Sequence, residues 1–75
     1  MSCPVVNKQG KRCSHKLKPL GNKTYHCDNP TDKHWLRAGI ERVDDKDCYL
    51  EHYDPESNLV YRKYGVDCSE LGELG

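Results

Sequence analysis

The residues of this chain best suited to chemistry are its five cysteines and four histidines. Thiolates and imidazoles are the ligands that zinc prefers, whereas pairs of cysteines can instead form disulfides. The cysteines stand at positions 3, 13, 27, 48 and 68, and an odd number cannot pair completely within one chain. The first residues lack the apolar stretch of a secretory signal peptide, so we expect a reducing, cytoplasmic location. In that compartment clustered cysteines indicate metal ligands.

A hairpin predicted over residues 15–25 would bring two of these cysteines together. Gly21 and Asn22 tolerate the positive φ angles of a tight turn, and apolar residues flank them. Cys13 and Cys27 then lie at the two open ends of the hairpin. A tetrahedral zinc site needs this proximity, because its bonds to sulfur are only about 2.3 Å long.

The segment that runs from Cys3-Pro4 through Cys13 and the hairpin to Cys27 and His34 resembles the zinc-ribbon family. That family has a Cys-Pro-x-Cys knuckle, a hairpin and a second Cys-x-x-Cys-type knuckle. The resemblance covers roughly residues 3–36, with nine residues between the first two cysteines and six between Cys27 and His34. It implies the ligand pairs Cys3 with Cys13 and Cys27 with His34. Four protein ligands imply a structural Zn²⁺, because no position remains for water or substrate.

The other histidines and cysteines carry weaker metal signals. His15 and His26 are alternative fourth ligands, although His26 directly precedes a cysteine and adjacent ligands are geometrically awkward. His52 has no ligand spacing around it and is predicted to lie on the surface. Cys48 is predicted to be a small buried residue and Cys68 an exposed thiol, with a disulfide between them as the alternative.

The sequence pattern predicts a small β-rich, metal-stabilised domain over residues 1–66. Residues 1–36 form its zinc-ribbon-like half, and residues 47–64 have the aromatic and β-branched flanks of a β-hairpin. Residues 33–43 fit either a short helix or a strand, because helical apolar spacing is interrupted by a glycine. Residues 67–75 are acidic and rich in glycine, which predicts a flexible tail.

The composition argues against an enzyme that depends on a deep pocket. Thirteen residues are Leu, Ile or Val, none is Phe, and 32% are charged. A core of this size contributes about 3–5 kcal/mol, so a metal, disulfide or partner is normally needed. The chain is too short to wall a pocket of about 300–1,000 Å³. It also lacks a phosphate-binding glycine loop and an apolar run of about 18 residues, so we expect a non-enzymatic monomer without a membrane span.

Charge is divided along the chain although the net charge is zero. Residues 1–40 contain eight basic and two acidic residues, whereas residues 41–75 contain four basic and ten acidic ones. Such a bipolar surface could orient one face toward a polyanion or toward an acidic patch on a protein.

Two classes of function fit these features, and the first is regulation of transcription through protein binding. Zinc ribbons recur in RNA polymerase subunits and in factors that dock on them, so the resemblance implies RNA polymerase as the partner. The short chain is also similar to small bacteriophage proteins that bind the host polymerase, which implies the cytoplasm of a bacterium or a phage-infected cell. An apolar pair within a polar loop suits an interface. The predicted contact residues are Val5, Val6, Lys8, Lys11 and Arg12.

The second class is direct, sequence-independent binding of nucleic acid through the basic half. Lysine and arginine would contact phosphates, and an aromatic ring would stack on a base. Besides the basic residues of the loop, the candidates are Lys16, Lys18, Lys23, Tyr25 and Trp35. The acidic half opposes the long-range attraction that such binding requires. A purely structural subunit is the third alternative.

Overall fold

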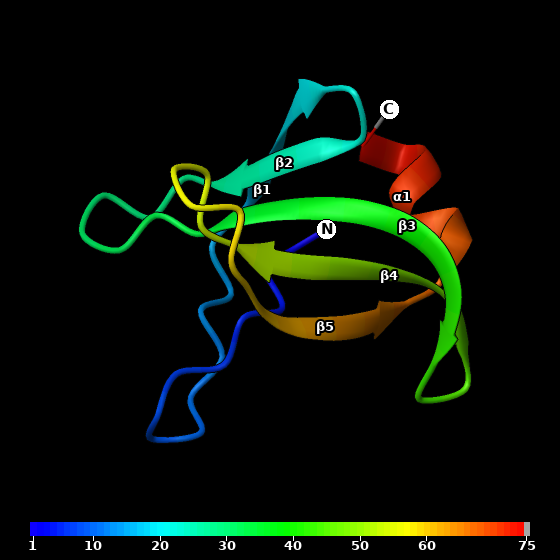
Figure 1. Cartoon of the computed structure of the whole chain (residues 1–75), viewed down its shortest axis with the longest axis horizontal. Helices are drawn as coiled ribbons and strands as arrows, with labels where there is room; N and C mark the ends of the chain where they lie inside the picture. Colours follow the sequence, from blue (N-terminus) through cyan, green and yellow to red (C-terminus); the bar gives the residue numbers. More distant parts are fainter. Residues whose placement is uncertain (75) are drawn as a thin grey trace.

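The computed structural model describes residues 1–74, which form one antiparallel sheet and a short helix (Figure 1). In chain order the elements are β1 (Leu17–Gly21), β2 (Thr24–Cys27), β3 (Trp35–Val43), β4 (Lys46–Tyr53), β5 (Val60–Val66) and α1 (Cys68–Leu74). The strands lie side by side in the same order as in the sequence, so each one pairs with its neighbour in the chain. The prediction of a small β-rich domain is confirmed, whereas membership of the zinc-ribbon class stays a prediction.

Of residues 33–43, for which the sequence fits a helix or a strand, residues 35–43 form strand β3, because this segment is held on both sides by hydrogen-bonded neighbours. It pairs with β2 along one edge and with β4 along the other. Its side chains alternate, with Leu36 buried on one face and Arg37 on the opposite one. Gly39 lies directly opposite Tyr49, and a Cβ atom there would overlap the tyrosine ring. The glycine that disfavours a helix is thus required by close cross-strand packing.

Both predicted hairpins are present, and local turn chemistry explains each. At the β1–β2 turn Asn22 and Lys23 have φ angles of 51° and 62°, as two-residue hairpin turns require. In the β4–β5 turn the Asp54 carboxylate accepts hydrogen bonds from the backbone N–H of Glu56 and from the Ser57 hydroxyl, both at 3.0 Å. These bonds hold the pKa of Asp54 below its ordinary value.

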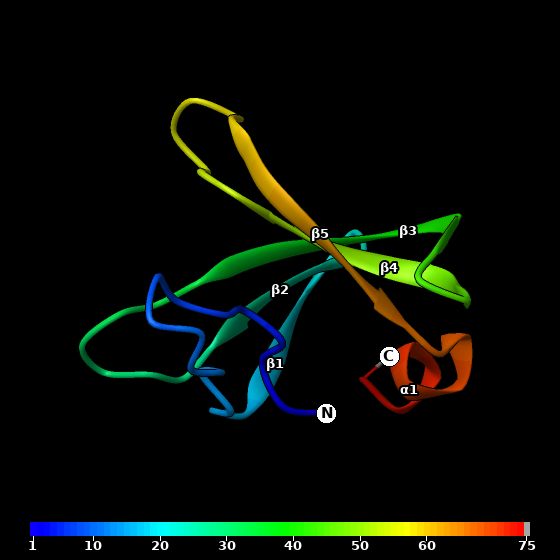
Figure 2. The same cartoon turned by 90° about the horizontal axis from the view of Figure 1, so that it is seen from below.

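One face of the sheet is covered by the N-terminal segment and by helix α1 (Figure 2). The core between these layers is small, and Leu17, Leu36 and Leu50 are its largest fully buried side chains. The nine buried hydrophobic residues that form the core are Cys3, Val5, Leu17, Tyr25, Cys27, Leu36, Cys48, Leu50 and Val66. Within the part of the chain that the structure describes, no polar or charged side chain is buried.

The C-terminal segment differs from the flexible tail that the sequence predicts. Cys68 begins helix α1 and forms a disulfide with Cys48 of β4, with 5.2 Å between the Cα atoms. Val66 pairs directly with Cys48, so the turn after β5 carries Cys68 back over it. The predictions of an exposed thiol at Cys68 and an unpaired Cys48 are therefore wrong, and the disulfide alternative holds. Leu71 also packs against the core, whereas Gly75 lies outside the described residues.

Helix α1 is the sole helix among residues 1–74, and it is neither long enough nor apolar enough to cross a membrane.

Candidate metal centre

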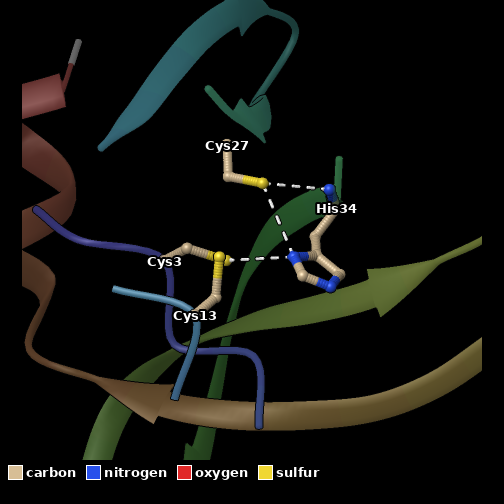
Figure 3. Close-up of side chains that lie close together, drawn as sticks. All are labelled: Cys3, Cys13, Cys27 and His34. Atoms are coloured by element: carbon tan, nitrogen blue, oxygen red, sulfur yellow. Dashed lines mark hydrogen bonds between the residues drawn. The ribbon is translucent and has the colours of Figure 1, made fainter. Parts of the chain in front are cut away.

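Four side chains from separate parts of the chain converge at one end of the core (Figure 3). They are those of Cys3, Cys13, Cys27 and His34, and their ligand atoms all lie within 4.8 Å of one another. The Sγ atoms of Cys3 and Cys27 are 3.8 and 3.5 Å from Nδ1 of His34. Two ligands of one tetrahedral zinc ion are separated by about 3.8 Å, given bonds of about 2.3 Å. These four residues therefore lie close enough together to bind a metal ion.

The first two ligands are placed by the N-terminal segment, which folds back on itself before β1. The backbone N–H of Cys3 donates to the carbonyl oxygen of His15 at 2.7 Å, and that of Cys13 donates to Val5 at 2.9 Å. Gly10, with a φ angle of 78°, allows the chain to reverse in the loop between them. The nine-residue spacer thus forms a hairpin-like loop and leaves both thiols at its base.

The second pair is placed by the loop that joins β2 to β3. Cys27 is the last residue of β2, and His34 immediately precedes β3. The backbone N–H of His34 donates to Sγ of Cys27 at 3.0 Å, a bond that stabilises a thiolate. The side-chain oxygen of Asn29 accepts hydrogen bonds from the backbone N–H groups of Thr31 and Asp32, at 3.0 and 3.2 Å. The loop is therefore ordered by its own polar groups.

The imidazole of His34 is oriented by contacts at both of its nitrogens. Nδ1 faces the sulfurs, and Nε2 lies 3.3 Å from Oδ2 of Asp32. Histidines that bind metals commonly donate their other ring N–H to a carboxylate, which fixes the tautomer and strengthens the ligand. On its other side the His34 ring meets His52 edge-on, with 5.2 Å between the centroids. Because the Asp32 carboxylate favours a proton on Nε2, the lone pair on Nδ1 of His34 is directed at the sulfurs.

Replacing Asp32 by alanine should weaken Zn²⁺ binding by about 10–100-fold, because the carboxylate no longer orients the imidazole. The same substitution in a His34→Cys background should have little effect, since four ligands remain and no imidazole needs orienting. Competition with a chromogenic zinc chelator measures both differences. An equal loss in the two backgrounds would show that Asp32 acts only through its general charge.

The buried thiol of Cys3 is disfavoured as a thiolate when no cation is present. Burial raises the pKa of Cys3 to about 12, and the neighbouring thiols of Cys13 and Cys27 also raise it, whereas a backbone hydrogen bond from Val5 lowers it. A divalent cation reverses this balance because it binds the deprotonated form. Metal binding should therefore release protons and weaken as the pH falls.

The other histidines lie outside the cluster. His15 lies 3.6 Å from a carboxylate oxygen of Asp28, and His26 packs against Trp35 with 5.5 Å between the ring centroids. His52 belongs to β4 and has a pKa below its ordinary value, because burial and the nearby His34 disfavour its charged form. The structure thus selects His34 among the candidate fourth ligands.

Two residues of the loop predicted to contact a protein partner, Val5 and Arg12, stabilise the fold instead. Val5 is 4% exposed and belongs to the core. The guanidinium of Arg12 donates to the carbonyl oxygens of Cys3 and Ser2, at 3.1 and 3.2 Å. Val6 is half-buried. The remaining predicted contact residues, Lys8 and Lys11, are exposed.

Of the two aromatic residues predicted to stack on nucleic-acid bases, Tyr25 and Trp35, the first is buried. Tyr25 is 7% exposed and lies within the core, so it cannot stack on a base. Trp35 is half-buried and carries the ammonium group of Lys33 over its ring, 5.9 Å from the centroid. The three basic candidates of this set are exposed: Lys16, Lys18 and Lys23.

No family model, curated protein or solved structure matches this chain, so the assignment of a function rests on the geometry of the site.

The sequence analysis missed the supporting roles of Asn29 and Asp32 in this site. The signal available for Asp32 was its position two residues before His34, in a loop flanked by two candidate ligands.

Proposed function

We propose that this chain is a small non-enzymatic domain that is held together by one structural Zn²⁺ and that binds a protein of the transcription machinery, RNA polymerase. The observation that carries the metal proposal is the convergence of three sulfurs and one imidazole nitrogen within 4.8 Å. Thiolate and imidazole donors in a tetrahedral arrangement favour Zn²⁺. Because four protein ligands complete that geometry, the ion would stabilise the fold and would offer no open position for catalysis.

The transcription proposal is supported by the way in which the hairpin and the ligands are arranged. The β1–β2 hairpin runs from just after the first ligand pair to the second pair, which is the order implied by the zinc-ribbon resemblance. Zinc ribbons recur in RNA polymerase subunits and in factors that dock on them.

The surface that best suits such a partner is the start of β5 rather than the N-terminal loop. Leu59, Val60 and Tyr61 are three consecutive exposed apolar residues, with Leu59 57% exposed. Strand β5 is the last strand of the sheet, so one of its backbone edges has no neighbouring strand. The exposed Arg62 follows directly and favours an acidic partner surface. We name Leu59–Arg62 the β5 patch.

Binding of the zinc-loaded protein to purified bacterial RNA polymerase, measured by biolayer interferometry, tests this proposal. We expect Leu59→Glu to weaken binding by about tenfold or more, because a charge replaces an apolar contact at the centre of the interface. Ile40→Glu is the matched control, since Ile40 is 82% exposed and lies outside the β5 patch.

Three outcomes would contradict parts of the proposal. Native mass spectrometry that finds no zinc would remove the structural metal. No binding to core polymerase or holoenzyme would remove the transcription partner. Binding to single-stranded DNA that falls steeply with added salt would instead favour the nucleic-acid alternative.

A further inference from the structure

The three cysteines of the metal centre differ in their access to solvent. Cys3 and Cys27 are fully buried, whereas Cys13 is partly exposed. Cys13 lines an open hollow of about 260 Å³ whose other walls include the polar side chains of Asn7, Lys11 and Asn29. A small polar oxidant such as hydrogen peroxide can therefore approach the cluster from the side of Cys13.

The hydrogen bonds to the sulfurs point to the same cysteine. Sγ of Cys27 accepts the backbone N–H of His34 at 3.0 Å. Sγ of Cys13 accepts the side-chain amide of Asn29 at the longer distance of 3.7 Å. Hydrogen bonds withdraw electron density from a thiolate and reduce its nucleophilicity. Cys13 therefore carries the most accessible of the three sulfurs, and its Asn29 donor lies farther away than the backbone donor to Cys27.

We propose that Cys13 is a peroxide-sensing residue, whose oxidation to a disulfide with Cys3 releases the metal. This inference rests on the zinc site proposed above. In the first step the Cys13 thiolate attacks one peroxide oxygen, so that an S–O bond forms, the O–O bond breaks and hydroxide leaves. The Cys3 thiolate then attacks the sulfur of the sulfenic acid, so that an S–S bond forms and a second hydroxide leaves. Two electrons pass from the two thiolates to one peroxide molecule.

The position of Cys3 makes it the partner for this second step. Its Sγ atom lies within 4.8 Å of Sγ of Cys13, and both residues stand at the base of the same folded-back N-terminal segment (Figure 3). Sγ of Cys27 lies within the same limit but is held by the His34 N–H. After oxidation only Cys27 and His34 remain as ligands, and two ligands are too few for a structural zinc site. A dithiol reductant would regenerate both thiolates and restore metal binding.

The test uses the full chain loaded with one Zn²⁺, treated with less than one equivalent of hydrogen peroxide. A chromogenic chelator reports the release of zinc, and peptide mass mapping with and without dimedone identifies the oxidised residues. We expect the dimedone adduct on Cys13, a disulfide between Cys3 and Cys13 when dimedone is absent, and an intact bond between Cys48 and Cys68. Adduct formation first on Cys27, or a bond between Cys13 and Cys27, would overturn the assignment.

Two variants give an independent measure. Cys13→His keeps four ligands but removes the reactive sulfur, and its peroxide-driven zinc release should be slower by about tenfold or more. Replacing Cys48 and Cys68 together by alanine removes the separate disulfide and should leave the release rate unchanged. Equal release rates in Cys13→His and the unaltered chain would overturn the inference. Failure of the unaltered chain to bind zinc would instead show that the proposed metal site itself is wrong, and that the inference falls with it.

Discussion

Removing the metal should unfold the N-terminal half of this protein and disrupt the sheet that it covers. Two of the four ligands, Cys3 and Cys27, are themselves fully buried core residues. Five of the nine core residues precede His34, and the four proposed ligands join the N-terminal segment to the loop between β2 and β3. Structural Zn²⁺ contributes about 10–16 kcal/mol of apparent binding free energy in zinc-finger peptides. A core of this size contributes only about 3–5 kcal/mol, so its loss should not be compensated.

The measurement is an amide NMR spectrum of the zinc-loaded protein before and after addition of a strong chelator, and again after zinc is restored. His34→Ala should reproduce the chelated spectrum, because it removes a ligand. His15→Ala is the matched control, since His15 lies outside the cluster beside Asp28, and it should retain one zinc and a dispersed spectrum. Acidification should act like the chelator, because protons compete with the metal for the ligand thiolates, and burial further disfavours the charged form of Cys3. A dispersed spectrum that survives chelation would show that the metal is not structural.

Truncation of Leu50 should produce a large loss of stability while leaving the metal ligands intact. Leu50 is fully buried in β4, and it lies directly opposite Ala38 on β3 and Tyr64 on β5. Leu50→Ala removes buried methyl groups and leaves a cavity, which costs about 2–5 kcal/mol. That loss is comparable to the whole contribution expected from the core.

Urea denaturation of the Leu50→Ala and Ile40→Ala variants with saturating zinc measures this effect. Ile40→Ala is the control, because a residue that is 82% exposed buries little surface and its truncation should change stability by about 0.5 kcal/mol or less. Equal midpoints for Leu50→Ala and Ile40→Ala would contradict the description of the core. A midpoint shift for Leu50→Ala with unchanged zinc stoichiometry would separate core packing from metal binding.

Several features of this fold could be predicted because their causes lie close together in the sequence. The two hairpins follow from short turn segments flanked by strand-forming residues, and the turn at Asn22 shows the positive φ angle that its residue type tolerates. The set Cys3, Cys13, Cys27 and His34 could be proposed from residue types, spacing and the hairpin between them. The structure brings these four residues within 4.8 Å of one another, and the identity of the metal stays a prediction.

Other features were decided only by contacts between distant parts of the chain. Residues 35–43 became a strand because β2 and β4 supply hydrogen bonds on both edges, which an ambiguous local pattern cannot reveal. Val5 and Tyr25 were assigned to binding surfaces, but packing of the N-terminal segment against the sheet buries both.

The disulfide between Cys48 and Cys68 is the clearest example of a feature that depends on contacts between distant parts of the chain. Cys48 and Cys68 are separated by 20 positions in the sequence, and neither has a neighbouring pattern that indicates a partner. They meet because β5 pairs with β4 in a register that places Val66 opposite Cys48, after which helix α1 turns back over the sheet. The sequence by itself determined the local turns and the candidate metal ligands, through the chemistry of single residues and short spacings. The tertiary structure alone decided which of the remaining side chains are buried, because burial depends on strand register and on segments that meet only after folding.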